Sequence, residues 1–361
     1  MRPKEDSIDG STLDTLGSFF GQEIVNAPLK NDHPLAWMLL NRAPWTRQWL
    51  AWFAQSARDL SATQGFEGLL ARLRDPRLYG EAISVFRVGA RLFRSGFTVA
   101  FDQPIAVSGQ DKRPDLRLAI QGESDWAYGE VTVLHTSQET LQAEATSQAI
   151  CDAIIGASPE LIHACRIIRP LAKPHLRQVV EEVRKVATRA RVTGKLQSYF
   201  KEGVLQLGVA PVEDQAGLEA WASQTGNVTH CIEGPPIRTD EPRRTKHRVA
   251  NKAKQIPSGH HNVLFVESPS LLYSGYGITE LMRELAEGVF EYPHVGGLVV
   301  TQMHLGGDAE ANVSQAGNKY LRRVSHELLI EHHLIMFNEY ADPLLPEAWA
   351  KCLESSFGTP F

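Results

Sequence analysis

The sequence predicts a mixed α/β protein with a central sheet flanked by helices. Two stretches carry this prediction: residues 79–134 show a helix followed by three strands, and residues 245–301 show helix, strand, helix and strand. Such alternation of helical and strand periodicity is typical of a sheet with helices on both faces. A third observation, an aromatic helical section before residue 76, adds an accessory region at the N-terminus.

The first stretch begins with a helix predicted from Gly80 to Ser95. Its apolar residues recur at helical spacing: Ile83, Phe86, Ala90 and Phe93. Gly96 then favours a left-handed stop just past the helix. The alternating residues 97–101 predict a strand, and after a polar loop residues 115–120 and 126–134 predict two more, joined by the turn-rich QGESD at 121–125.

Two acidic residues fall on these last strands. Glu130 shares one strand face with Tyr128 and Thr132, because side chains alternate with a period of two. In the predicted hairpin Asp115 lies nearly opposite Thr132 and therefore diagonal to Glu130, about 7 Å away or less. Two carboxylates at that separation suit Mg²⁺ or Mn²⁺, and Glu81 on the preceding helix is a candidate third ligand.

The same acids also fit ordinary structural roles. Asp115 has Arg113 and Arg117 as neighbouring ion-pair partners, and Glu130 fits the solvent face of a half-exposed strand. Thr132 is a good strand former in its own right. A glutamate within an otherwise apolar strand is costly to bury without a partner, and this favours a functional site.

The motif order carries a resemblance to a known family. Pro114-Asp115, a hairpin, and then Glu130-Val131-Thr132 resemble the core of the PD-(D/E)XK nuclease superfamily, and in particular bacterial members whose last motif reads E-x-T instead of E-x-K. The preceding phrase FRVGARLFRSGFTVAF is similar to the helix and strand before the motif in those proteins. The likeness extends over residues 79–346, including FNEYADPLLP near its end.

The resemblance implies a restriction-endonuclease-like fold and metal-dependent cleavage of phosphodiester bonds. Two positions depart from the pattern: Thr132 stands in place of the usual catalytic lysine, and Val85 stands where several relatives carry the helix glutamate. The glutamate at position 81 is therefore a shifted candidate. The implied metal ligands are Asp115, Glu130, the backbone carbonyl of Val131, and Glu81.

A basic segment follows later in the chain. Residues 242–254 (PRRTKHRVANKAK) contain six Lys or Arg residues and no acid, within a helix predicted from Thr245 to Ile256. The net charge of −5 does not favour a general nucleic-acid coat, but a local basic stripe can contact phosphates. A solvated helix face explains the segment equally well. The predicted nucleic-acid contacts are Arg243, Arg244, Lys246, Arg248 and Lys252.

The phrase KAKQIPSGHHNVLFVE resembles the later helix and strand of the same nuclease group, which often bear a K-x-x-Q-like element. By that resemblance Lys252, Lys254 or Gln255 faces the metal site, where a migrated lysine would take the role that Thr132 cannot fill. Phosphate contact or plain solvation remains the alternative. The implied catalytic set is Asp115, Glu130, Thr132, Lys254 and Gln255.

The predicted domains are an N-terminal helical region at 1–76, a core at 77–156 and 245–346, an inserted or flanking α/β subdomain at 157–244, and a tail at 347–361. Residues 1–30 are expected to be loosely held. Pro44 should divide 32–58 into two helices. The tryptophans of that section fit packing within their own domain or a docking surface: Trp37, Trp45, Trp49 and Trp52.

Other signals are weak. The four cysteines form no C-x-x-C pair and favour free thiols in a reducing, cytoplasmic compartment. No apolar run is long enough for a membrane span. His326, His332 and His333 fall in a stretch predicted to be helical, and their spacing lacks a zinc motif. With His260 and His261 they are interpreted as surface or capping residues.

The predicted function is metal-dependent hydrolysis of phosphodiester bonds in DNA or RNA, with DNA the preferred partner, in bacterial DNA processing or defence. The alternative is a catalytically silent module of the same fold that binds nucleic acid, or a protein partner through the Trp-rich helices. A deep pocket away from the two acids would instead indicate unrelated chemistry. Many enzymes of this fold act as dimers, so a homodimer is also expected, although the sequence identifies no interface.

Overall fold

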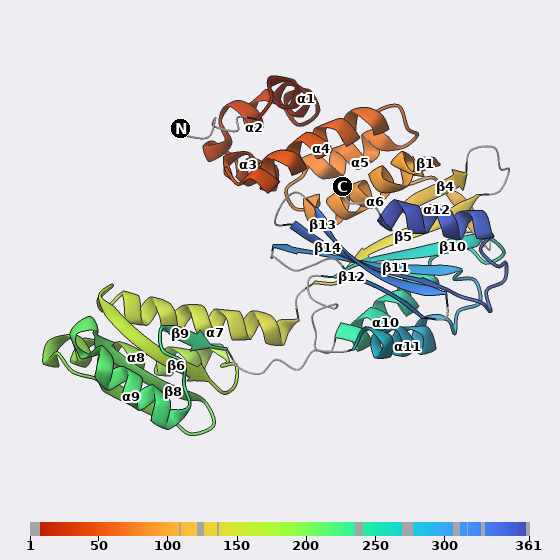
Figure 1. Ribbon diagram of the computed structural model, residues 1–361. Coiled ribbons are helices and arrows are strands. Elements are labelled where there is room, and N and C mark those ends of the chain that lie inside the picture. Colours follow the sequence, from red (N-terminus) through yellow and green to blue (C-terminus); the bar gives the residue numbers. More distant parts are fainter. Residues whose placement is uncertain are drawn as a thin grey trace. The chain divides into compact units, whose positions relative to one another are not determined.

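A computed structural model describes residues 8–107, 110–120, 126–135, 137–234, 241–268, 277–305, 311–315, 317–325 and 329–358. The chain forms two compact units (Figure 1). Unit 1 comprises Met1–His135 and Glu241–Phe361, and unit 2 comprises Thr136–Asp240. The inserted unit therefore begins about twenty residues earlier than the boundary predicted at 157, because the helix at 138–155 packs within unit 2.

Unit 1 is built on a mixed sheet of eight strands in the order β1-β4-β5-β10-β11-β14-β13-β12. Strand β5 is parallel to β10 and β10 to β11, whereas the other pairs are antiparallel. The strands are β1 (Phe97–Phe101), β4 (Leu116–Ile120), β5 (Ala127–Val133), β10 (His261–Glu267), β11 (Gly297–Leu305), β12 (Ala311–Gln315), β13 (Asn318–Ser325) and β14 (Leu329–Phe337). A short hairpin, β2 (Ile105–Val107) with β3 (Gln110–Lys112), lies where a polar loop was predicted.

Helices cover both faces of this sheet, as predicted (Figure 1). Helices α6 (Tyr79–Arg94) and α12 (Glu347–Gly358) pack on one face, and α10 (Glu241–Ala253) and α11 (Ile278–Val289) pack on the other. Strand alternation divides the side chains between two cores: Val131 and Phe265 point to the α6 face, and Leu264 points to the α10 face. Glu130 is level with Leu264 on the neighbouring parallel strand, so it also belongs to the α10 face.

The N-terminal region is a helical layer packed into the α6-side core. Its helices are α1 (Gly10–Phe20), α2 (Gln22–Asn26), a 3₁₀ turn (Pro28–Lys30), α3 (Pro34–Leu40), α4 (Pro44–Leu60) and α5 (Phe66–Arg74). The prediction of a loose start is wrong for the described part, since Leu16 and Phe20 are buried. Pro44 does separate two helices, as the first residue of α4. Trp49 and Trp52 are buried in the core, whereas Trp37 is 67% exposed.

The late histidine-containing segment is a strand. The prediction of a helix there is wrong: β14 pairs with β11 and β13 on either side, which buries its residues on both faces. His332 and His333 are accordingly buried and are not surface residues. His326 lies outside the described residues. The tail at 347–358 is helix α12, with Trp349 and Phe357 in the core.

Unit 2 is a smaller α/β layer with its own core. Its four-stranded sheet has the order β7-β8-β6-β9. The elements are α7 (Gln138–Ile155), β6 (Leu161–Ile167), α8 (Lys173–Thr193), β7 (Gln197–Lys201), β8 (Leu205–Pro211), a 3₁₀ turn (Val212–Asp214), α9 (Gln215–Thr225) and β9 (Cys231–Glu233). On α7, Ala143 and Thr146 face inward, whereas Leu141 and Ala145 are exposed.

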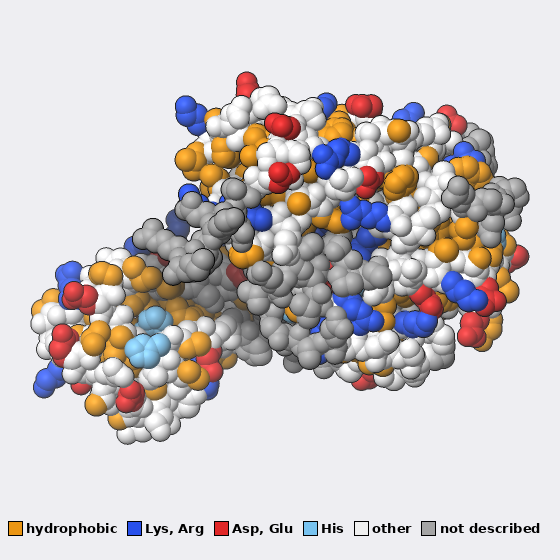
Figure 2. Space-filling view, turned by 45° about the horizontal axis from the view of Figure 1, so that its top comes forward, with side chains coloured by type: hydrophobic (Ala, Val, Ile, Leu, Met, Phe, Trp, Pro, Cys, Tyr) orange, Lys and Arg blue, Asp and Glu red, His pale blue; other side chains and the backbone are white. Residues whose placement is uncertain are grey.

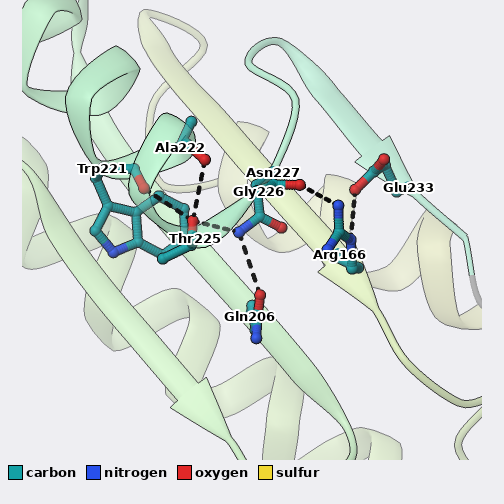
Figure 3. Close-up of polar contacts among 8 residues, drawn as sticks. All are labelled: Arg166, Gln206, Trp221, Ala222, Thr225, Gly226, Asn227 and Glu233. Carbon is teal, nitrogen blue, oxygen red and sulfur yellow. Dashed lines mark hydrogen bonds and ion pairs between the residues drawn. The ribbon is translucent and has the colours of Figure 1, made fainter.

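A polar network ties the short edge strand β9 to the rest of unit 2 (Figure 3). The Arg166 guanidinium on β6 donates to Glu233 on β9 over 2.7 Å and to the Gly226 carbonyl at the end of α9. Asn227 donates to Thr225 and to Gln206 on β8. These contacts connect three strands and a helix end, so we assign them a structural role.

Candidate functional site

The two predicted acids lie side by side on neighbouring strands. The β4–β5 ladder pairs Leu116 with Gly129, so the next position along brings Asp115 directly opposite Glu130. The predicted pairing of Asp115 with Thr132 is wrong by two residues. In the observed register the two carboxylates are closer than in the predicted diagonal arrangement, because directly opposite residues are the nearest cross-strand neighbours.

Three side chains form what we call the acidic site: Asp115, Glu130 and Lys252 of α10. The Lys252 ammonium donates to Glu130 Oε2 over 2.7 Å and lies 3.8 Å from Asp115 Oδ2. The Asp115 carboxylate also accepts the backbone N–H of Val131 over 2.9 Å, which holds it against β5. The two acids are close enough to share a hydrogen bond when one of them is protonated. Both carboxylates therefore converge on one position already occupied by a positive charge.

The acidic site holds two carboxylates and one ammonium, and burial strengthens the effect of this imbalance. Glu130 is only 4% exposed. Loss of hydration and the nearby Asp115 charge raise its pKa to about 7, and Lys252 offsets this only in part. Burial disfavours the charged form of Lys252, but the attraction of Glu130 and Asp115 outweighs it and raises the lysine pKa. One ammonium does not compensate two carboxylates, so the site favours an additional positive charge.

Three further residues were predicted for this site: Glu81 and Val131 as metal ligands, and Thr132 in the catalytic set. Glu81 is exposed at the start of α6 and contributes a weak attraction to the Lys252 ammonium. Val131, predicted to bind metal through its carbonyl, contributes its N–H to the orientation of Asp115. Thr132 is buried two residues beyond Glu130 on the same strand face.

Lys254 and Gln255, assigned by resemblance to the catalytic set, lie beyond the end of α10 at Ala253. Both side chains are exposed, and the backbone carbonyl of Lys254 accepts a hydrogen bond from Lys112. Lys252, which the sequence suggested both for phosphate contact and for the metal site, is the lysine of this segment that contacts the acids.

The other basic residues of α10 fall on two different edges of the helix. Arg243, Arg244 and Arg248 line a groove of about 390 Å³ together with Leu134 and His247. Lys246 is on the opposite edge, 3.9 Å from Glu284 of α11, with its stem against Gly288. Lys246 is therefore directed toward α11 and is not among the residues that line the groove. Figure 2 shows Lys and Arg interspersed with acidic side chains on the face in view, with no extended basic surface there.

A second hollow, of about 540 Å³, belongs to unit 2 and is open to solvent. Its lining includes Cys151 and His163, but no hydrogen bond joins their side chains in the described structure. It lacks the convergence of buried charges seen at Asp115 and Glu130. The acidic site is therefore the stronger candidate, because buried and unbalanced ionisable groups are typical of functional sites.

The acidic site offers carboxylate oxygens, the type of ligand that Mg²⁺ prefers. Mg²⁺ binds through one or two carboxylates and keeps several waters or substrate oxygens, and Asp115 and Glu130 supply two such carboxylates. The Lys252 ammonium lies between them in this structure, so a metal ion held by both would have to displace it. Among the described residues no cluster of three or more His, Cys, Asp or Glu side chains could hold a metal. A site made by protein ligands alone, such as structural zinc, is thus not found in that part of the chain.

Comparison of the chain with protein-family models, with curated proteins and with solved structures finds no match. None of the described helices is long and apolar enough to cross a membrane. The four cysteines are free thiols, as predicted.

A second set of buried charges was not predicted. On the α6 side of the sheet, Arg87 pairs with Glu267, and Arg91 pairs with Glu331 over 2.6 Å. We call this the arginine–glutamate network; it also includes Ser84 and His333. The sequence carried a partial signal for it, since Ser84, Arg87 and Arg91 share one face of a predicted helix. Their glutamate partners are some 180 to 240 residues away in the chain, where no local pattern marks them.

Proposed function

We propose that this protein is a metal-dependent nuclease that hydrolyses phosphodiester bonds in nucleic acid, with a restriction-endonuclease-like core in unit 1. The observation that carries the proposal is the convergence of Asp115 and Glu130 on one cation position, with the Lys252 ammonium 2.7 Å from Glu130. The order of helix α6, strands β1, β4 and β5, helix α10 and strand β10 agrees with the order of elements that the resemblance implies.

Each member of the site has a separate task. Asp115 and Glu130 would hold Mg²⁺ or Mn²⁺, which lowers the pKa of a bound water and neutralises charge on the scissile phosphate. The hydrogen bond from the Val131 N–H fixes the Asp115 carboxylate before substrate binds. Lys252 then places a positive charge beside the reacting phosphate, where charge develops in the transition state. In this scheme Lys252 supplies what Thr132 cannot.

The groove lined by Arg243, Arg244 and Arg248 supports a polyanionic substrate. Its described lining is basic apart from Leu134, and it contains no carboxylate. A local cationic groove within a chain of net charge −5 favours a polyanion held at one place over a general basic coat. DNA remains the proposed substrate, in bacterial DNA processing or defence, on the resemblance stated above.

Cleavage assays with supercoiled plasmid and Mg²⁺ or Mn²⁺ test the proposal. We expect nicking or linearisation by the native protein and a loss of it in both Asp115→Asn and Glu130→Gln. Nucleic-acid binding without cleavage, unchanged in both variants, would instead identify a silent binding module. Absence of both binding and cleavage on DNA and RNA would reject the proposal.

A further inference from the structure

The stripe of cations on α10 has a defined register with respect to the acidic site. Residues 244, 248 and 252 are spaced by four, so they follow one edge of the helix at intervals of about 6 Å along its axis. The two ends of the stripe are anchored: Arg244 donates to the His135 carbonyl just after β5, and Lys252 contacts Glu130 within β5. The helix thus runs antiparallel to β5 with this edge along the strand.

Arg248, the middle residue of this stripe, is not anchored in the same way. Arg248 is exposed and lines the groove, and within the described structure its guanidinium has no hydrogen-bond or ion-pair partner. His247 lies beside it, with its ring bonded to Asn251 over 3.1 Å. An arginine that faces a carboxylate-free groove between two anchored cations has the geometry for bidentate binding of a phosphate.

We propose that Arg248, with Arg244 and His247, forms a second phosphate site for the same nucleic-acid strand whose scissile phosphate lies at Lys252. This inference rests on the proposed function. The site is about 6 to 12 Å from the acidic site along the helix axis. A nucleic-acid strand advances about 3.4 Å per nucleotide in a B-form duplex and further when extended. The second phosphate is therefore one to three nucleotides from the scissile bond.

The opposite edge of the same helix supplies a matched control. Lys246 carries the same charge two residues away, but it lies near Glu284 and packs its stem against α11. Arg248→Gln and Lys246→Gln each remove one positive charge from α10, so a general electrostatic effect would be the same in both. A specific phosphate contact would be lost only in Arg248→Gln.

Equilibrium binding of a fluorescein-labelled oligonucleotide, measured by anisotropy in EDTA, tests the site without any need for cleavage. We expect Arg248→Gln to weaken binding about tenfold and to reduce the slope of log K against log salt by about one unit. Lys246→Gln should change neither quantity. Equal behaviour of the two variants would overturn the second phosphate site, whatever the cleavage assays show.

A neutral methylphosphonate linkage moved along the oligonucleotide locates the contact. One position, one to three nucleotides from the cut, should weaken binding to the native protein but have no further effect on Arg248→Gln. A position-independent effect would overturn the proposed register. Inorganic phosphate or a mononucleotide that competes as strongly as the oligonucleotide would overturn a backbone-phosphate site in favour of a small-anion site. An Arg248 effect without any cleavage would support the phosphate site and reject the nuclease proposal.

Discussion

Unit 1 holds two buried clusters of charge on opposite faces of one sheet, and they differ in balance. In the arginine–glutamate network each of Glu267 and Glu331 has its own arginine, and the pKa of both carboxyls is lowered despite burial. In the acidic site two carboxylates share one lysine, and the Glu130 pKa is raised. The arginine–glutamate network is balanced in charge, although Glu331 Oε1 has no hydrogen-bond partner among the described residues. The acidic site has one more carboxylate than it has ammonium groups.

The difference teaches how to distinguish structure from function among buried charges. Both clusters are buried and hydrogen-bonded, so burial alone does not identify the site. The arginine–glutamate network connects α6 to β10 and β14, and Arg91 also donates to the Ser356 carbonyl of α12. Its role is to hold the helical layer on the sheet. In the acidic site two carboxylates share one ammonium, which is electrostatically unfavourable. Under the proposed function a bound metal ion would relieve this repulsion.

The substitution expected to destabilise the arginine–glutamate network most is Arg91→Met. This change leaves the fully buried Glu331 without its arginine, and breaking one partner of a buried pair costs about 3–5 kcal/mol. Arg94→Met on the same helix is the control, since its pair with Asp59 spans 3.7 Å and both side chains are about one-third exposed, so it should cost under about 1 kcal/mol. Urea unfolding measures both. Equal losses in the two variants would contradict the assigned role.

The corresponding test of the acidic site changes activity and spares the fold. Asp115→Asn and Glu130→Gln should each lower kcat/KM by about 10²–10³-fold, the usual cost of one electrostatic contact to the transition state. Their free energy of unfolding should stay equal or rise, because each removes a charge that crowds its neighbour. If a variant loses activity only because it is unfolded, the substituted residue, Asp115 or Glu130, has a structural role and not a catalytic one.

Acid titration separates the clusters further. The Arg91 guanidinium and His333 lower the Glu331 pKa to about 2 against the burial that opposes them. A depressed carboxyl pKa contributes stability that is present above the unfolded value near 4.5 and is lost as pH falls toward 2. The stability difference between the native protein and Glu331→Gln should therefore shrink by up to about 3 kcal/mol from pH 6 to pH 2. A pH-independent difference, measured by urea unfolding, would show that the pair carries no such coupling.

Sequence reasoning identified the elements of unit 1 well because their periodicities are local. Helix α6 and strands β1, β4 and β5 are within about two residues of their predicted bounds. It failed on β14, where burial on both faces removes the alternation that marks a strand. It failed also on the β4–β5 register, because the connecting turn at 121–125 gives no fixed loop length from which to count.

The sequence also could not show which residue of the basic segment contacts Asp115 and Glu130. Whether Lys252, Lys254 or Gln255 does so depends on where α10 ends and on how the helix is rotated against β5. Both follow from the packing of Val249 and Ala253 into the core shared with α11. The four-residue spacing of Arg244, Arg248 and Lys252 was visible, but nothing local indicated that this edge, and not the edge with Lys246, faces the strand.

The smallest expected effects on kcat/KM test the assignment of Lys252 as the residue that contacts the two acids. Lys254→Ala and Gln255→Ala should change kcat/KM less than about twofold, since surface substitutions away from partners are nearly neutral and both side chains are exposed beyond the helix. Lys252→Gln should lower it about 10²-fold, and Lys252→Arg should recover part of the loss because the charge is restored with a different shape. Single-turnover cleavage compares the four variants at one metal concentration. A large loss of kcat/KM in Lys254→Ala, with little change in Lys252→Gln, would show that the catalytic positive charge belongs to Lys254 in the turn after α10 and not to Lys252.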